Sequence, residues 1–281
     1  MSYKTIVVHV NESRHGAARV ELAADIAAQH EAHLIGVATS ALPAPFYMPG
    51  IDAGAGEALT GYLAFVKEGA LTALSVFDGL ARQAGVVSIE HRHVEEQTEV
   101  ALCLEGRYGD LLVIGQNDPE ESLIAQNADM QYYVLTHSPG PILFVPYAGR
   151  FKTTGKRIVV AWDGSVEATR AIAGAMPFLQ KADIVQVAVF NASRTPQRHG
   201  DQPGADIALH LARHGVNVEV SAQTTDASMD IGNALLSHLA DFNADLLVMG
   251  GFGQSRFREF MLGGVTRTML KSMTVPVLMA H

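Results

Sequence analysis

Short apolar runs alternate with longer segments of helical periodicity, most clearly in the second half of this chain. Runs without interior polar residues are typical of strands that are buried on both faces of a parallel sheet. The predicted strands there are Ile158–Trp162, Ile184–Phe190, Val216–Ala222, Leu246–Met249 and Val275–Met279. Between them, Val166–Gln180 and Ile231–Phe242 repeat apolar positions at helical spacing, and Ser165 is a suitable N-cap. The pattern predicts an α/β fold with helices over both faces of a parallel sheet.

The two halves of the chain repeat one another. Lys4–Ser13 matches Lys156–Ser165 at an offset of 152 residues, and Asp110–Gly115 matches Asp245–Gly250 at an offset of 135. Ordered blocks that match in this way indicate a duplication. The polar connection between the halves predicts two domains, residues 1–148 and 156–281.

A glycine-rich loop follows one of the predicted strands. Glycine lets the backbone approach a ligand closely, and the helix that is expected to begin after the loop would direct free N–H groups toward an anion. The sequence therefore predicts a phosphate cradle. Its residues are Gly250, Gly253, Gly263, Gly264, Val265 and Thr266.

The two halves of the chain differ in net charge. The chain carries a net charge of −9, which argues against nucleic acid as a partner. Residues 1–150 hold 8 basic and 18 acidic residues, whereas residues 151–281 hold 12 and 11. A polyanionic ligand should therefore prefer the second half. One cysteine, no secretory signal and no apolar run of bilayer length predict a soluble, cytoplasmic protein without a membrane partner.

The segment Val160–Ser165, read as Val-Ala-Trp-Asp-Gly-Ser, and the late spacing of Gly250, Gly253 and Gly263 resemble the universal stress protein family in its tandem form. The resemblance covers both halves. It implies two tandem doubly wound α/β domains, each with a five-stranded parallel sheet of order 3-2-1-4-5. This arrangement is Rossmann-like and similar to adenine nucleotide alpha hydrolase-like folds.

The resemblance also implies an ATP site in the second half. Adenine would lie near Asp163 and Val189, and the ribose and phosphates on the glycine loop. The expected nucleotide-binding residues are Ala161, Trp162, Asp163, Val189, Met249, Gly250, Gly253, Gly263, Gly264, Val265 and Thr266. Gly264 stands where the family usually has serine or threonine, and Trp162 is bulkier than usual.

The first half departs from this pattern. Asn11 takes the place of Asp163, and a gapless alignment of the two loops sets Asp118 and Asp129 opposite Gly253 and Gly264. Carboxylates in an anion cradle repel phosphate. The first half is therefore expected to bind no nucleotide and to be a structural or regulatory partner.

No catalytic residue is predicted. The pairs His91 with His93 and His210 with His214 have spacings that permit metal binding, but neither has a clear third ligand, so no metal site is predicted. The favoured function is a cytoplasmic stress-response sensor or regulator that binds ATP or a similar adenine nucleotide. The alternatives are a nucleotide-independent interaction protein with a relic glycine loop, and a slow ATP hydrolase.

The last strand of each half provides an assembly surface. Pro141–Val145 and Pro276–Met279 are sheet edges in the order 3-2-1-4-5, and exposed apolar edges pair readily with another strand. We expect the two to lie side by side, so that the halves form an intramolecular pseudo-dimer. The sequence leaves open whether two chains associate further as a homodimer.

Overall fold

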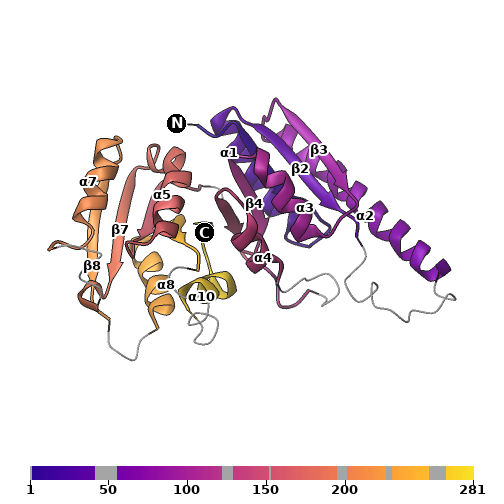
Figure 1. Ribbon diagram of the computed structural model, residues 1–281. Helices are drawn as coiled ribbons and strands as arrows, with labels where there is room; N and C mark the ends of the chain where they lie inside the picture. The colour runs from indigo at the N-terminus through magenta and orange to yellow at the C-terminus, as the bar shows by residue number, and fades with distance from the viewer. Residues whose placement is uncertain are drawn as a thin grey trace. The chain divides into compact units, whose positions relative to one another are not determined.

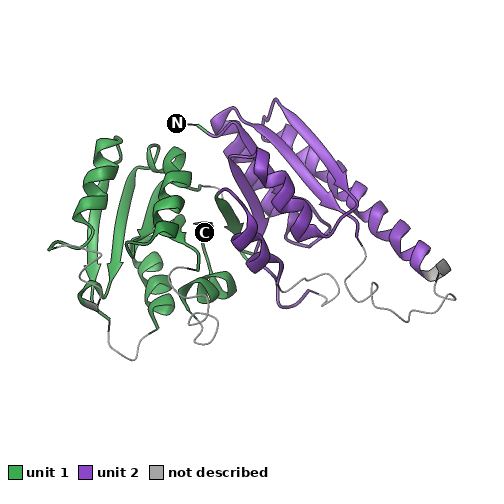
Figure 2. Cartoon of the chain, viewed as in Figure 1, with its two compact units in different colours: residues 1–2, 141–281 green, residues 3–140 purple. Residues whose placement is uncertain are grey.

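The computed structural model describes residues 2–41, 56–121, 129–151, 153–194, 201–225, 230–252 and 264–281. The chain divides into two compact units (Figure 2). Unit 2 is Tyr3–Gly140, and unit 1 comprises residues 1–2 and Pro141–His281. None of the helices in the described ranges is long and apolar enough to cross a membrane.

Unit 2 contains a parallel sheet of order β3-β2-β1-β4. Its elements are β1 (Thr5–His9), α1 (Gly16–His30), β2 (His33–Thr39), α2 (Gly56–Gln83), β3 (Ile89–Val94), α3 (Thr98–Glu105), β4 (Leu111–Gly115) and α4 (Met130–His137). Helices α1 and α2 pack against each other, as do α3 and α4 (Figure 1). Strands β1, β2 and β4 are buried because the crossover helices cover the faces of the sheet, whereas the edge strand β3 is only partly buried.

Unit 1 contains a sheet of order β5-β10-β9-β6-β7-β8. Its elements are β5 (Ile142–Val145), β6 (Arg157–Ala161), α5 (Val166–Leu179), β7 (Ile184–Phe190), α7 (Ala205–Arg213), β8 (Val218–Gln223), α8 (Ile231–Phe242), β9 (Leu246–Gly250), α10 (Val265–Ser272) and β10 (Val277–Ala280). The five strands of the second half are parallel and confirm the order 3-2-1-4-5. The α/β fold class is thereby confirmed.

Strand β5 comes from the first half of the sequence but belongs to unit 1. It pairs antiparallel with β10, with Leu278 opposite Leu143 and Met279 opposite Ile142. These are the two strands that the sequence predicts to lie side by side. The domain boundaries 1–148 and 156–281 and the pseudo-dimeric arrangement stay predictions.

Two strand starts differ from the pattern for local reasons. β10 begins at Val277 rather than Val275, because Pro276 has no N–H to donate to the ladder. β8 begins at Val218 rather than Val216, because the amide of Val216 donates to Leu211 at the end of α7. Gly215 has a φ of 80°, a conformation that glycine adopts without strain, and so it favours the end of α7 at this point.

The pairing of β5 with β10 predicts the effect of a charge at its centre. Leu278 is fully buried, so Leu278→Lys should lower the free energy of unfolding by about 2–4 kcal/mol through an unpaired buried charge. Leu209→Lys, at a half-exposed position on α7, is the matched control and should leave stability within about 0.5 kcal/mol. Chemical denaturation measures both. An unchanged midpoint for Leu278→Lys would contradict the buried pairing.

Candidate functional site

A pocket of about 220 Å³ opens in unit 1 at the carboxyl ends of its central strands. The first strand of the second half, β6, lies between β7 and β9. The chain continues from β6 into α5 and from β9 toward α10, so the strand order reverses between β6 and β9. Such a switch point is where ligands bind in open α/β sheets. The pocket is lined by Ala161, Trp162, Asp163, Ser165, Ala188, Phe190, Ile231, Leu235, Met249, Gly250, Val265 and Thr266.

The floor of the pocket depends on close packing at Gly250. A Cβ atom there would lie 2.6 Å from the backbone nitrogen of Ala168 and 2.9 Å from the carbonyl carbon of Glu167. Both atoms belong to the first turn of α5, which cannot move aside as a flexible side chain can. Gly250 is therefore required by the packing of α5 on β9, whether or not a ligand binds.

Asp163 lies at the mouth in a tight turn between β6 and α5. Its Oδ1 accepts a hydrogen bond of 3.0 Å from the amide of Ser165, and Gly164 has a φ of 71°. The Ser165 hydroxyl in turn accepts from the amide of Ala168 at 3.1 Å, which confirms Ser165 as the N-cap of α5. The turn holds an exposed carboxylate beside the pocket, as an acceptor for ligand N–H or O–H groups.

The opposite wall is the start of α10. Gly264 is its N-cap and brings no side chain to bond the first amides. The amides of Val265 and Thr266 have no acceptor among the residues that the structure describes. Thr266 is buried, and its hydroxyl oxygen accepts from the amide of Phe252 at 3.1 Å. Free amides and the helix dipole make this end of α10 attractive to an anion.

The inner wall is apolar and is supported from behind by His238. The rings of Phe190 and His238 meet edge to face, with centroids 5.9 Å apart, and His238 Nδ1 lies 2.6 Å from Gln223 Nε2. Burial lowers the pKa of His238, and the charge of Asp241 opposes this shift only in part. The edge-to-face contact with His238 limits the orientations that the Phe190 ring can adopt.

Seven of the eleven residues expected from the sequence line this pocket: Ala161, Trp162, Asp163, Met249, Gly250, Val265 and Thr266. Gly264 lies next to it as the N-cap of α10. Val189 does not line it. Its side chain faces Gly204 on the other side of the sheet, because successive strand residues point to opposite faces. Gly253 and Gly263 lie outside the described residues.

Sequence reasoning missed five lining residues: Ser165, Ala188, Phe190, Ile231 and Leu235. Two signals could have found four of them. Ala188 and Phe190 flank Val189 on β7 and so share the face opposite to it. Ile231 and Leu235 lie one helical turn apart on α8, which places them on the same face of the helix.

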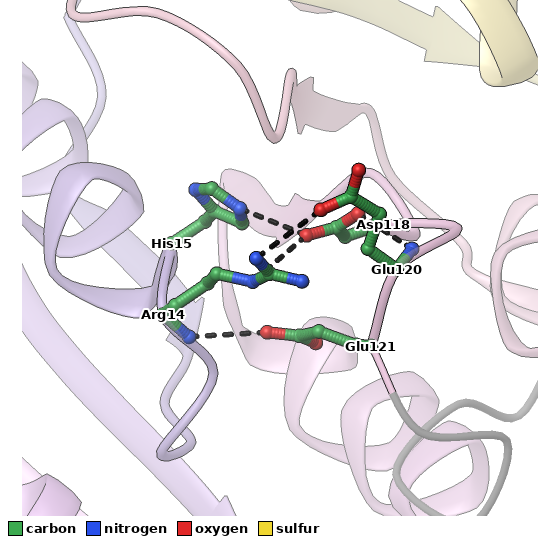
Figure 3. Close-up of polar contacts among 5 residues, drawn as sticks. All are labelled: Arg14, His15, Asp118, Glu120 and Glu121. Atoms are coloured by element: carbon green, nitrogen blue, oxygen red, sulfur yellow. Dashed lines mark hydrogen bonds and ion pairs between the residues drawn. The ribbon is translucent and has the colours of Figure 1, made fainter.

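The corresponding edge of unit 2 holds a cluster of charged side chains. We call Arg14, His15, Asp118, Glu120 and Glu121 the clasp (Figure 3). Asp118 Oδ2 lies 3.1 Å from Arg14 Nε and 3.0 Å from His15 Nε2. Arg14 Nη1 also pairs with Glu120 at 3.4 Å, and the amide of Arg14 donates to Glu121 at 3.1 Å. The clasp thus joins the segment before α1 to the loop after β4.

Asp118 is the centre of the clasp. Its side chain is 5% exposed, whereas that of Arg14 is 50% exposed. The amide of Glu120 donates to Asp118 Oδ1 at 2.9 Å. This hydrogen bond, followed by the hydrogen bond from His15 and the charges of Arg14 and His15, holds the pKa of Asp118 below its ordinary value. The folded chain therefore favours the ionised carboxylate.

Because the pKa of Asp118 is lowered, its contribution to folding stability should depend on pH in a defined direction. A carboxyl group with a lowered pKa stabilises the fold at neutral pH and loses that contribution as the pH falls through its folded pKa. Asp118→Asn should therefore lower the midpoint of thermal unfolding at neutral pH, and the difference from the parent should shrink on acidification. Thermal melts across the acid range measure this.

Asp25→Asn is the matched control because its effect should have the opposite sign. Burial, with the charge of Glu21, raises the pKa of Asp25, so its ionised form opposes folding at neutral pH. Neutralising it should raise the midpoint there. A difference for Asp118→Asn that is the same at every pH would show that the ionised carboxylate does not stabilise the clasp.

The described residues hold no group of three or more His, Cys, Asp or Glu side chains arranged to bind a metal. The rings of His210 and His214 lie 4.7 Å apart, and His93 Nε2 is hydrogen bonded to the hydroxyl of Ser40 at 2.7 Å. The two histidine pairs of the sequence are thus each placed without a third ligand among these residues.

Comparison with known proteins gives consistent results. Residues 155–281 match the model of the universal stress protein family. The universal stress protein Slr1230 of Synechocystis sp. is 29% identical over 206 residues, which cover 70% of this chain and 67% of that protein.

Solved structures share the fold along nearly the whole chain. A universal stress protein from Archaeoglobus fulgidus is 17% identical, with a TM-score of 0.72, over 98% of this chain and 94% of its own. The functionally unknown protein PA1789 from Pseudomonas aeruginosa is 15% identical, with a TM-score of 0.59, over 98% and 92%. The resemblance predicted from the sequence is confirmed.

Proposed function

We propose that this chain, whose residues 155–281 match the model of the universal stress protein family, binds ATP or a similar adenine nucleotide in unit 1 and acts as a cytoplasmic stress-response sensor or regulator. One observation carries the proposal. The pocket joins an apolar interior, an exposed carboxylate and the free end of α10 at a single switch point.

These three features match the three parts of a nucleotide. Phe190, Ile231 and Leu235 offer apolar contact to a base, and Asp163 is an acceptor for its amine or for a ribose hydroxyl. The start of α10 suits phosphate. The volume of about 220 Å³ is below the range of about 300–1,000 Å³ for sites that enclose a whole ligand. This size suits a base and ribose inside, with the phosphates at the mouth.

The lining favours binding over hydrolysis. Among the described lining residues, Asp163 is the only ionisable one, and in the proposed pose its carboxylate already accepts from the base amine or a ribose hydroxyl. A general base must be free to accept a proton from the attacking water. We therefore propose a regulator rather than an efficient ATP hydrolase.

One observation favours a second candidate. Gly250 is required by the packing of α5 on β9, so a glycine here is expected even in a chain that binds no nucleotide. The alternative is a nucleotide-independent interaction protein. Mass spectrometry of small molecules released from the purified chain separates the two, because only the first predicts an adenine nucleotide.

A carboxylate at the start of α10 tests the phosphate position. Val265→Asp places a negative charge in the first helical turn, where it favours the helix but repels phosphate. We expect ATP affinity to fall by at least about tenfold, as one lost charge-assisted contact implies, while adenosine affinity is kept. Isothermal titration calorimetry with both ligands measures this.

Val265→Asn is the control for this experiment, since it has the same size without the charge. It should bind ATP nearly as the parent does. Equal ATP affinity in Val265→Asp and Val265→Asn would mean that α10 does not hold the phosphates, and the proposed orientation of the ligand would then be wrong.

The two halves should differ in stoichiometry. Unit 2 has Asn11 in place of Asp163 and closes the loop after β4 with the carboxylates of the clasp. We expect one nucleotide per chain, held by unit 1. Calorimetric stoichiometry with ATP is the measurement. A value near two would contradict this asymmetry.

A further inference from the structure

Unit 2 contains a buried cation, Arg19, that forms no ion pair with another described residue. Arg19 on α1 is 5% exposed. Its Nε donates to the carbonyl of His9 at 2.8 Å, and its Nη2 donates to Asn11 Oδ1 at 2.7 Å. Both acceptors are neutral, and the ion pairs among the described residues do not include Arg19. Buried charges in proteins are normally compensated by an opposite charge.

The guanidinium lies at the switch point of unit 2. A Cβ atom on Gly115, the last residue of β4, would come within 2.4 Å of Arg19 Nη1. The carbonyl of His9 is at the end of β1, and β1 pairs with β4. Arg19 therefore lies between the carboxyl ends of the two strands, at the place that corresponds to the pocket of unit 1.

A second buried polar group at this point is the imidazole of His9. His9 is 6% exposed, and its Nδ1 has no hydrogen-bond partner among the described residues. His9 occupies the register position of Ala161, which lines the pocket of unit 1. Burial, together with the charge of Arg19, lowers the pKa of His9 well below its ordinary value. A neutral imidazole with a protonated Nδ1 would donate to an anion.

A negative charge that favours the protonated form of Arg19 comes from Glu121 of the clasp. Burial lowers the pKa of Arg19 to about 10, and the charge of Glu121 acts in the opposite direction. Glu121 accepts from the amide of Arg14, whose side chain pairs with Asp118 and Glu120. The loop carboxylates thus lie where the cations of unit 2 would attract an external anion.

We propose that unit 2 carries an oxyanion site, with Arg19, Arg14 and His9 as its donors, and that the loop carboxylates Asp118, Glu120 and Glu121 act as a tethered ligand that keeps it closed. The external ligand would be a compact oxyanion, with phosphate as the simplest example, because a guanidinium matches two phosphate oxygens at once. The site is separate from unit 1, so it does not depend on nucleotide binding there.

Neutralising the tethered carboxylates should open the site. In Asp118→Asn/Glu120→Gln/Glu121→Gln, we expect one additional inorganic phosphate per full-length chain. The affinity should be at least about tenfold above that of the control, because three repelling charges are removed. Equilibrium dialysis with radiolabelled phosphate at constant ionic strength measures both numbers.

The control removes the same charge elsewhere in unit 2. Glu21→Gln/Glu31→Gln/Glu68→Gln alters three exposed glutamates and should bind phosphate as the parent does. Equal phosphate binding by the two triple variants, both folded by circular dichroism, would overturn the proposal. If the clasp variant does not fold, the single Asp118→Asn change is measured against Glu31→Gln by the same criterion.

A final variant separates a site from a general charge effect. Arg14→Gln in the neutralised background should abolish the gain, since the half-exposed Arg14 is a donor of the site. Arg19→Met in that background should do the same, provided that it folds. A gain that persists without Arg14 would mean that phosphate responds only to net charge, and the proposal would then be wrong.

Discussion

The pairing of one strand with two neighbours, whose following helices diverge, determines where this protein can bind anything. In unit 1, β6 lies between β7 and β9, and in unit 2, β1 lies between β2 and β4. All of these strands are parallel, so their carboxyl ends meet at one edge of each sheet. The helices that follow the first and fourth strands direct their N-terminal turns toward this edge. Each unit thus has one sheet edge where the N-terminal ends of helices favour a negative charge.

The two units place different side-chain charges at this edge. Unit 1 leaves the start of α10 without a capping side chain and keeps its ionisable group, Asp163, at the mouth. Unit 2 fills the same edge with a buried guanidinium from Arg19 and closes it with the clasp around Asp118. The same fold therefore presents an open pocket with one carboxylate at its mouth in one unit and an internally neutralised contact in the other.

Periodicity and the internal repeat predict most of the fold, because buried parallel strands and amphipathic helices leave a direct pattern in the sequence. The strand order of the second half comes from the family resemblance and is confirmed. The starts of β8 and β10 are mispredicted because a single amide donates elsewhere, to Leu211, or is absent, at Pro276. A single hydrogen bond that is made elsewhere or is missing does not change the pattern of apolar residues, so that pattern cannot predict it.

The candidate site is less predictable, because a motif records turn residues rather than the walls around them. Asp163 and Gly250 are visible as part of a motif, but Phe190 and Leu235 enter the pocket only through their facing direction on β7 and α8. Arg19 illustrates the same limit. In the sequence it is an ordinary helix residue, and only packing reveals that its charge is buried beside Gly115.

Aligned positions explain why one edge is hollow and the other filled. Unit 1 has Ala161, Ala171 and Thr266 where unit 2 has His9, Arg19 and Gln131. In unit 2 the Arg19 side chain bonds the end of β1, and Gln131 donates to the carbonyl of Gly115 at 2.9 Å. In unit 1, Ala161 and Thr266 line the pocket, whereas the space beside Gly250 is taken by the backbone of the first turn of α5. Protein interiors close most gaps, because voids lose dispersion contacts. A pocket at a switch point, beside helix amides that have no acceptor among the described residues, is the arrangement on which the proposed ligand site rests. Unit 2 shows the same fold with side chains of its own at that place.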